Sequence, residues 1–219
     1  MFNLFKKDKT TIKSVSIPTF GWDRTKEDES INQWINQDQT VTLSINFFDL
    51  NPDLPSIQNI EKIRNYYREQ IVQANGGLIQ VDLVEIDDFK MIKTIFKIQQ
   101  EGSGITYLTS LTIPFDACSY VVKIQAPEIG VTGMRESIIA DRLLKENVIK
   151  IDDSGYIGWN EDPYLKDFTK GLPMNLSERS DYDKDFPKHP LSVSRKLIGQ
   201  IEAEIELKEV LKKIKKFKK

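Results

Sequence analysis

One histidine is available for acid–base chemistry in this sequence of 219 residues, and its neighbours decide what it can do. His189 stands between Lys188 and Pro190, directly before a predicted helix whose expected N-cap is Ser192. A catalytic histidine needs a nucleophile and an orienting partner in contact with it, and no Ser-His-Asp order is recognisable here. We therefore interpret His189 as a turn residue that satisfies the start of this helix. The alternative is a hydrolase that uses His189 with residues of the acidic loop before it.

Three carboxylates alternate in that loop with a spacing that resembles a calcium loop, namely Asp181, Asp183 and Asp185. An EF-hand loop needs a glycine at its sixth position and a glutamate at its twelfth. Counted from Asp181, this sequence has Phe186 and Ser192 at those positions, so the pattern fails. Cys118 is the only cysteine, so cysteine and histidine together supply too few ligands for a zinc site. We expect neither a metal site nor a cofactor.

The C-terminal residues carry two apolar stripes at helical spacing. The first stripe consists of Leu197, Ile198, Ile201 and Ile205, and the second of Leu207, Val210, Leu211, Ile214 and Phe217. At about 100° per residue, the two stripes lie nearly on opposite sides of one helix. No helix breaker separates them, so the sequence predicts a continuous amphipathic helix over residues 191–219.

The second stripe is flanked by lysines and is the most specific functional prediction from the sequence. The predicted partner-binding residues are Leu207, Val210, Leu211, Lys212, Ile214, Lys216 and Phe217. A basic amphipathic helix suits a protein partner, self-association or an anionic membrane surface, and a protein contact is preferred. The opposing interpretation is that the helix bends and packs on its own domain.

Charge and targeting signals set the expected compartment. The sequence has 31 Lys and Arg against 33 Asp and Glu, a formal net charge of −2, so no nucleic-acid partner is expected. Residues 1–7 contain no apolar core long enough for a signal peptide. No stretch approaches the length needed to span a bilayer, so the expected location is the cytoplasm.

The elements that must position these groups are predicted by hydrophobic periodicity. Alternation predicts four consecutive strands between Leu78 and Ala126, and a further strand over 41–47. Their short connections favour antiparallel neighbours. Helical spacing predicts one helix capped by Ser56 and running to about Ala74, and a second over about 131–145. The predicted fold is therefore α+β: an antiparallel meander sheet packed with helices, as an α/β/α sandwich.

The chain divides by composition into three parts. Residues 1–149 hold the sandwich, residues 150–190 lack sustained periodicity, and residues 191–219 form the predicted C-terminal helix. The middle part is rich in aromatic side chains, which would not suit a disordered linker. We therefore expect an ordered, irregular extension that lies over the body of the protein.

The order of these elements resembles the PsbP/DcrB-like α/β/α sandwich family. The resemblance covers about residues 10–146 and rests on the 41–47 strand, the 57–71 helix, the long meander and the helix that begins Thr132-Gly-Met-Arg-Glu136. It implies a binding, assembly or chaperone module without enzymatic activity, and some members resemble effector chaperones of type VI secretion. The resemblance carries no site residues. The phrase Tyr182-Asp-x-x-Phe-Pro-x-His-Pro-Leu-Ser192 resembles a tail motif of uncharacterised bacterial proteins.

These observations together favour a non-catalytic binding or accessory protein of the cytoplasm. A chaperone or an immunity-type partner protein is the expected kind of role. A pocket that holds His189 beside a serine and a carboxylate would favour the hydrolase instead.

Overall fold

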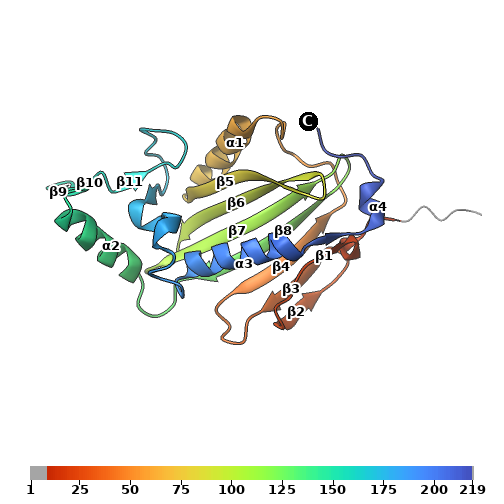
Figure 1. Ribbon diagram of the computed structural model, residues 1–219, viewed down its shortest axis with the longest axis horizontal. Coiled ribbons are helices and arrows are strands. Elements are labelled where there is room, and N and C mark those ends of the chain that lie inside the picture. The colour runs from red at the N-terminus through yellow and green to blue at the C-terminus, as the bar shows by residue number, and fades with distance from the viewer. Residues whose placement is uncertain (1–8, 219) are drawn as a thin grey trace, which may run out of the picture.

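The computed structural model describes residues 9–218, and its centre is one seven-stranded antiparallel sheet (Figure 1). The strand order is β2-β3-β4-β8-β7-β6-β5. The strands are β2 (Asp23–Glu27), β3 (Ile31–Ile35), β4 (Thr42–Phe48), β5 (Gly77–Ile86), β6 (Phe89–Gln99), β7 (Ile105–Pro114) and β8 (Ser119–Pro127). The predicted α+β class is confirmed. The segment for which the sequence predicts no signal peptide lies outside the described residues.

Strands β5 to β8 are consecutive neighbours, as the alternation over residues 78–126 predicts. Asp87 and Asp88 join β5 to β6 with φ angles of 51° and 65°, and two positive φ angles are the mark of a tight type I′ hairpin. Strand β4 pairs with β8 along its whole length. The first three strands of the sheet therefore extend the predicted meander on its β8 side.

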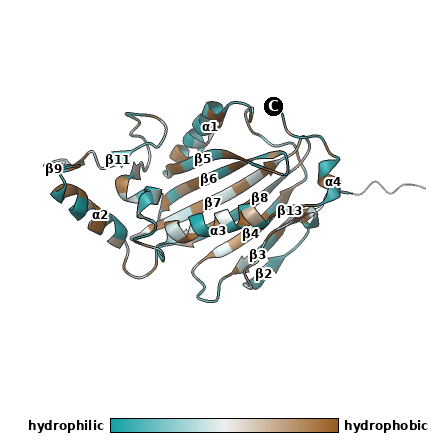
Figure 2. Ribbon diagram, in the orientation of Figure 1, coloured by the Kyte–Doolittle hydropathy of each residue, from teal (hydrophilic) through white to brown (hydrophobic). Residues whose placement is uncertain are grey.

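Residues 9–218 form four α-helices. They are α1 (Ile60–Gln73), α2 (Met134–Lys145), α3 (Pro190–Glu204) and α4 (Glu209–Lys212). Asn59 caps α1 by accepting a hydrogen bond from the Lys62 N–H, so the expected N-cap Ser56 is wrong. Apolar and polar residues alternate along the central strands, and each helix mixes apolar and polar residues (Figure 2). No helix among residues 9–218 is long and apolar enough to cross a membrane.

The two long helices lie on opposite faces of the sheet. Helix α3 packs Ile198 and Ile201 against a cluster that includes Leu111 of β7. Helix α1 packs Ile63 against a cluster that includes Ile92 of β6. Thr112 is the cross-strand neighbour of Ile92, and Leu111 precedes it, so the two clusters occupy opposite faces. We call these faces the α3 face and the α1 face. Figure 1 shows α3 crossing in front of the strands.

The C-terminal residues do not form the single helix that the sequence predicts. Helix α3 ends at Glu204, Ile205 is extended, and strand β13 (Glu206–Leu207) follows. Strand β13 pairs antiparallel with β1 (Val15–Ser16), and the short helix α4 comes next. A continuous helix could not bury two opposite stripes on one flat face. The bend resolves this conflict, because it lets both stripes pack into the cluster that contains Leu111, except for Phe217, which joins the cluster that contains Ile92.

The predicted partner-binding stripe packs against the chain's own core. Leu207, Leu211 and Phe217 are buried, and Val210 and Ile214 are partly buried against the α3-face cluster. Leu211 belongs to the α3-face cluster, whereas Phe217 belongs to the α1-face cluster. The residues after β13 therefore wrap around one end of the sheet and join its two layers. We call residues 205–218 the tail.

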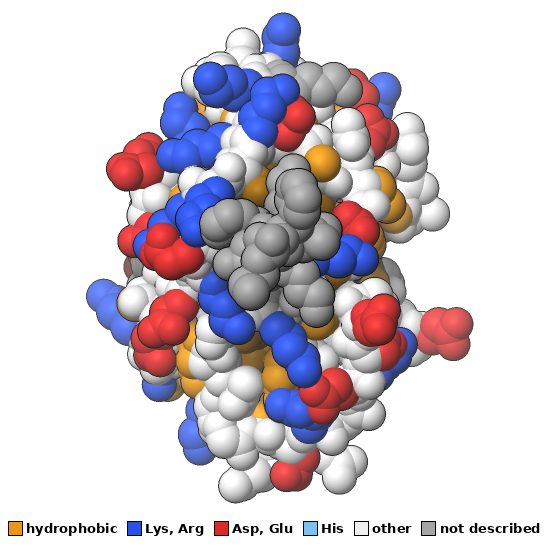
Figure 3. Space-filling view, turned by 90° about the vertical axis from the view of Figure 1, so that its right-hand side faces the viewer, with side chains coloured by type: hydrophobic (Ala, Val, Ile, Leu, Met, Phe, Trp, Pro, Cys, Tyr) orange, Lys and Arg blue, Asp and Glu red, His pale blue; other side chains and the backbone are white. Residues whose placement is uncertain are grey.

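The lysines of the tail lie at the surface, and three of them have local partners. Lys212 pairs with Glu209 at 2.9 Å, and Lys215 pairs with Asp116 at 3.0 Å. The Lys216 Nζ donates to the Asp88 carbonyl and lies 4.6 Å from the centre of the Phe89 ring. Figure 3 views this end of the molecule, where Lys and Arg side chains gather in the upper part and acidic side chains lie among them.

Residues 150–190 are ordered and lie against the ends of β5, α1 and α2. They contain the hairpin of β9 (Lys150–Asp152) and β10 (Gly155–Ile157), the paired strands β11 (Asn160–Glu161) and β12 (Met174–Asn175), and two 3-10 helices. A buried bidentate ion pair at 2.8 Å joins Asp162 to Arg68 of α1. Gly77 is needed here, because an added Cβ would lie 1.6 Å from the Leu172 carbonyl oxygen.

Candidate functional site

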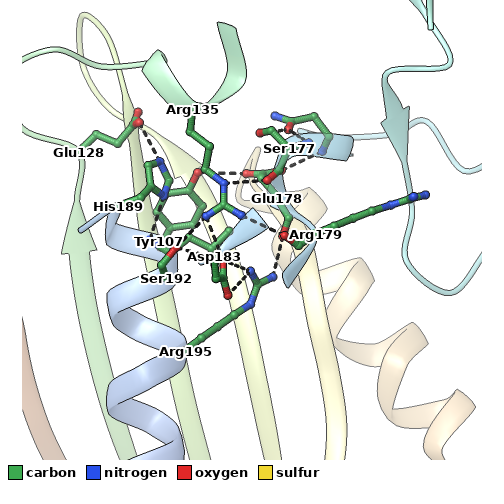
Figure 4. Close-up of polar contacts among 12 residues, drawn as sticks. Tyr107, Glu128, Arg135, Ser177, Glu178, Arg179, Asp183, His189, Ser192 and Arg195 are labelled. Atoms are coloured by element: carbon green, nitrogen blue, oxygen red, sulfur yellow. Dashed lines mark hydrogen bonds and ion pairs between the residues drawn. The ribbon is translucent and has the colours of Figure 1, made fainter. Parts of the chain in front are cut away.

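His189 caps helix α3, as its predicted position at the start of a helix suggests. Its Nδ1 accepts a hydrogen bond from the Leu191 N–H at 3.3 Å, so the expected N-cap Ser192 is wrong. The other ring nitrogen, Nε2, lies 3.2 Å from Oε1 of Glu128, a residue that follows β8. The ring also packs edge-on against Tyr107, with centroids 5.4 Å apart. Figure 4 shows His189 held between Glu128 and Tyr107.

The serine nearest in sequence to His189 is turned away from it. The Ser192 hydroxyl accepts from Arg135 Nη1 at 2.9 Å and donates to Asp183 at 3.1 Å. Among residues 9–218, His189 makes no hydrogen bond to a serine, threonine or cysteine side chain. The arrangement therefore does not assemble the nucleophile and base that the hydrolase alternative requires.

Arg135 is the buried centre of this region, with 1% of its surface exposed. Its guanidinium donates to the Ser177 carbonyl at 2.7 Å and to the Arg179 carbonyl at 3.0 Å. It also forms an ion pair with Asp183 at 3.0 Å. These partners come from the extension, so Arg135 fastens residues 177–183 to α2 (Figure 4). A planar guanidinium with several donors suits this task better than a lysine would.

These contacts explain the motif from Tyr182 to Ser192 in structural terms. Asp183 accepts from both Arg135 and Arg195. Ser192 accepts from Arg135 and donates to Asp183, and His189 caps α3. Arg195 also donates to the Glu178 carbonyl at 2.7 Å. The motif therefore joins the extension to two helices.

A second buried ion pair lies beside this network. Lys97 of β6 and Glu178 approach to 2.6 Å, and their side chains are 3% and 0% exposed. The Tyr107 hydroxyl donates to the same Glu178 carboxylate at 3.2 Å. Burial and the adjacent Glu178 charge raise the pKa of the Tyr107 hydroxyl well above its ordinary value. Tyr107 is therefore a neutral hydrogen-bond donor here.

Glu128 and Glu136 line a cavity of about 310 Å³ between the start of α2 and the extension. Burial alone would raise the pKa of Glu128, but hydrogen bonds from His189 and the Ile105 and Gly133 N–H groups lower it overall. Burial raises the pKa of Glu136, and the neighbouring Glu128 and Glu178 carboxylates act in the same direction. The two carboxyl groups therefore differ, because only Glu128 is surrounded by donors.

The α1 face holds a larger open groove of about 660 Å³. Helix α1 packs over β5 and β6, where Tyr67 contacts the ring of Phe96. Residues of strands β7, β8, β4 and β3 form the floor of the groove. The side chains that line this groove include Gln33, Ser44, Phe96, Leu108, Lys123 and Gln125. Lys123 is the only charged residue in the lining of the groove, as far as the described chain shows.

Sequence reasoning missed several residues of these sites. Arg135 stands in phase with the buried Ile139 and Leu143, and a charge on the apolar stripe of a helix is a signal that could have been read. Glu128 and Glu136 match neither the spacing of a calcium loop nor the cysteine and histidine ligands of a zinc site, so the sequence gives no signal for them. The groove has no sequence signal of its own, since its floor consists of the ordinary polar positions of four strands.

Comparisons with known proteins show similarity to solved structures only. No family model matches the sequence, and no curated protein matches it. The Ran-binding protein Mog1p of Saccharomyces cerevisiae is similar over 89% of this chain and 90% of its own, with 9% identity and a TM-score of 0.46. A protein of unknown function from Pseudomonas aeruginosa is similar over 57% of this chain and 83% of its own, with 13% identity and a TM-score of 0.33.

A crystal structure from Bacteroides thetaiotaomicron is similar over 57% of this chain, with 16% identity and a TM-score of 0.35. The matched region spans 42% of the length of that protein. At these identities and TM-scores, none of the likenesses assigns a family or a function to this chain. Membership of the PsbP/DcrB-like family therefore stays a prediction, while the α+β architecture with a large antiparallel sheet is established by the fold itself.

Proposed function

We propose that this protein is a non-catalytic binding module that holds an acidic peptide segment of a partner protein in the groove on its α1 face. The observation that carries the proposal is the unequal covering of the sheet. The α3 face is covered by α3, β1 and the tail, whereas α1 packs over β5 and β6 on the other face and leaves the groove residues of β8, β4 and β3 open. A groove of about 660 Å³ remains, which lies within the usual range of about 300–1,000 Å³ for ligand sites.

The lining of the groove favours a polar, acidic ligand. Amide and hydroxyl groups from Gln33, Ser44 and Gln125 offer hydrogen bonds, and Phe96 and Leu108 offer a small apolar contact. Lys123 gives the lining a positive charge that no lining carboxylate offsets. Electrostatic complementarity of this kind favours partners of opposite charge and raises association rates. A peptide that carries Asp or Glu beside an apolar residue matches this surface.

More specifically, we propose that the protein acts in the cytoplasm as a chaperone or an immunity-type partner protein. The tail packs on the chain's own core, so we favour the groove over the tail as the interface with a partner. The hydrolase alternative finds no support at His189, which caps a helix and pairs with Glu128. A contact of the surface lysines with an anionic membrane has no supporting geometry beyond the mixed charges at the α4 end.

Site-specific photo-crosslinking in extracts of the native host tests the proposal. A photoreactive phenylalanine at Gln125 in the groove is expected to capture one protein, with the crosslink mapped by mass spectrometry to an acidic segment. The same residue at Gln200, exposed on α3, is the matched control and is expected not to reach that segment. Lys123→Glu should remove the crosslink, because like charges repel, whereas Lys150→Glu on β9 should leave it unchanged.

Two outcomes would contradict the proposal. One is capture of the same proteins from Gln125 and Gln200, which would indicate non-specific contact. The other is a crosslink from Gln125 that persists at full yield in the Lys123→Glu variant.

A further inference from the structure

Three ligand-type side chains from distant parts of the chain converge beside the cavity at the start of α2. Glu128 follows β8, Glu136 lies in the first turn of α2, and His189 precedes α3. One ligand atom from each lies within 4.8 Å of the other two, and this is the only such group among residues 9–218. Figure 4 shows the Glu128 and His189 side chains pointing toward each other.

Glu136 supplies an independent observation that points to a cation. Its Oε2 is buried and has no hydrogen-bond partner. A buried oxygen without a partner loses its hydration without compensation, which is costly for a carboxylate. Glu128, by contrast, accepts from Ile105, Gly133 and His189. A cation between the two carboxylates would satisfy Glu136 and neutralise both.

The spacing of Glu128 and His189 suits a tetrahedral metal ion. His189 Nε2 and Glu128 Oε1 are 3.2 Å apart. Two ligands of a tetrahedral zinc ion at about 2.0–2.1 Å stand about 3.3 Å from each other. The Glu136 carboxylate, the third ligand, must come within bonding distance of the ion by a rotation of its side chain. The adjoining cavity of about 310 Å³ leaves room for a water molecule as fourth ligand.

We propose that Glu128, Glu136 and His189 form a binding site for Zn²⁺. One imidazole nitrogen and two carboxylate oxygens are a donor set that zinc accepts. The two carboxylates carry the charge that balances the ion. The Ile105 and Gly133 N–H groups, which already donate to Glu128, would hold this ligand in orientation, as outer hydrogen bonds do in zinc sites.

Binding requires one change of tautomer at His189. Its Nδ1 accepts from the Leu191 N–H, so the proton of the neutral ring is on Nε2 and points at Glu128. The ion takes the place of that proton, which returns through solvent to Nδ1. The ring stays neutral, and the Leu191 contact is given up. That contact measures 3.3 Å, which is long for a hydrogen bond, so little is lost.

Isothermal titration of the untagged full-length chain with ZnCl₂ tests the site. The native protein is expected to bind one Zn²⁺ per chain. Glu136→Gln should weaken binding at least about tenfold, because it removes a ligand rather than an outer hydrogen bond. Asp141→Asn, an exposed carboxylate on the same helix, is the matched control and should bind as the native protein does. Titration with Co²⁺ should give visible absorption bands typical of tetrahedral coordination in the native protein and Asp141→Asn only.

The titration results distinguish a zinc-binding site from a purely structural contact between these side chains. Circular dichroism of Glu136→Gln checks that it is folded, and its amide can still occupy the cavity. Absence of Zn²⁺ binding by the native chain would overturn the proposal. Equal affinity in the native chain and the Glu136→Gln variant would overturn it as well, since Glu136 would then not be a ligand. Neither result depends on what the groove binds.

Discussion

Deletion of residues 207–219 is expected to lower the free energy of unfolding by roughly 5 kcal/mol or more, because three buried apolar side chains are lost and each is worth about 1.5–3 kcal/mol. These side chains are Leu207, Leu211 and Phe217. The deletion also removes the pairing of β13 with β1, which exposes Val15. A loss of this size approaches the total stability of many domains, about 5–15 kcal/mol. Urea unfolding monitored by circular dichroism measures it.

Single substitutions keep this prediction testable if the truncated chain does not fold. Leu211→Ala is expected to cost about 2–5 kcal/mol, because Leu211 is fully buried. Lys213→Ala, exposed in the same turn, is the matched control and should change stability by less than about 0.5 kcal/mol. A truncated chain that keeps its stability but loses a partner or an oligomeric state would contradict this account. It would restore the partner-binding role that the sequence predicts for these residues.

Arg135→Met is expected to destabilise the protein by about 3–5 kcal/mol, since it removes one partner of a buried charged network. Asp183 would keep Arg195, but the carbonyls of Ser177 and Arg179 would lose their donor. Residues 150–190 should detach first, because these contacts fasten the extension to α2. Urea unfolding gives the magnitude, and limited proteolysis gives the location of the first cleavage.

Arg142→Met is the matched control for this substitution. Arg142 lies on the same helix and pairs with Asp185, but its side chain is 44% exposed. Exposed ion pairs contribute about 0–1 kcal/mol, so the control should be nearly neutral. Equal effects of the two substitutions would contradict the role of Arg135 as the fastening residue. Cleavage outside residues 150–190 would contradict the expected order of detachment.

The strands of the sheet could be predicted because their signal is local. In β7, Tyr107, Leu111 and Ile113 are all buried and alternate with residues of the other face. In β8 the same alternation places Tyr120 and Val122 in the core. Each strand has one covered face, so a period of two appears in the sequence itself. Turn residues such as Asp87 and Asp88 then fix the antiparallel order.

The tail could not be predicted because its fold depends on a distant segment. No residue from Glu204 to Leu207 forbids a helix. The two apolar stripes before and after this segment imply only that both must be buried. The chain bends because β1 offers an unpaired strand edge, where Lys208 donates to the Ser14 carbonyl. Local propensity is a weak guide when such tertiary contacts compete with it. The prediction of a continuous helix was therefore wrong, and after the bend both stripes except Phe217 pack into one cluster.

The polar clusters escaped prediction for a related reason. His189 and Glu128 are 61 residues apart in sequence, and only the fold brings them to 3.2 Å. Their residue types are common on solvated surfaces, so nothing in the sequence distinguishes them from ordinary charges. The assignment of His189 to the start of a helix rested on local sequence and agrees with the structure.

The central claim, that the groove on the α1 face holds an acidic segment, is tested most directly by a charge exchange. Fluorescence anisotropy would compare a synthetic peptide of the crosslinked segment with the same peptide in which its acidic residue is lysine. The native protein should bind the acidic peptide, and Lys123→Glu should bind it about tenfold more weakly, a change of about 1.4 kcal/mol. The lysine peptide should recover affinity for Lys123→Glu. If Lys123→Glu binds the acidic peptide as tightly as the native protein does, the groove is not the binding site.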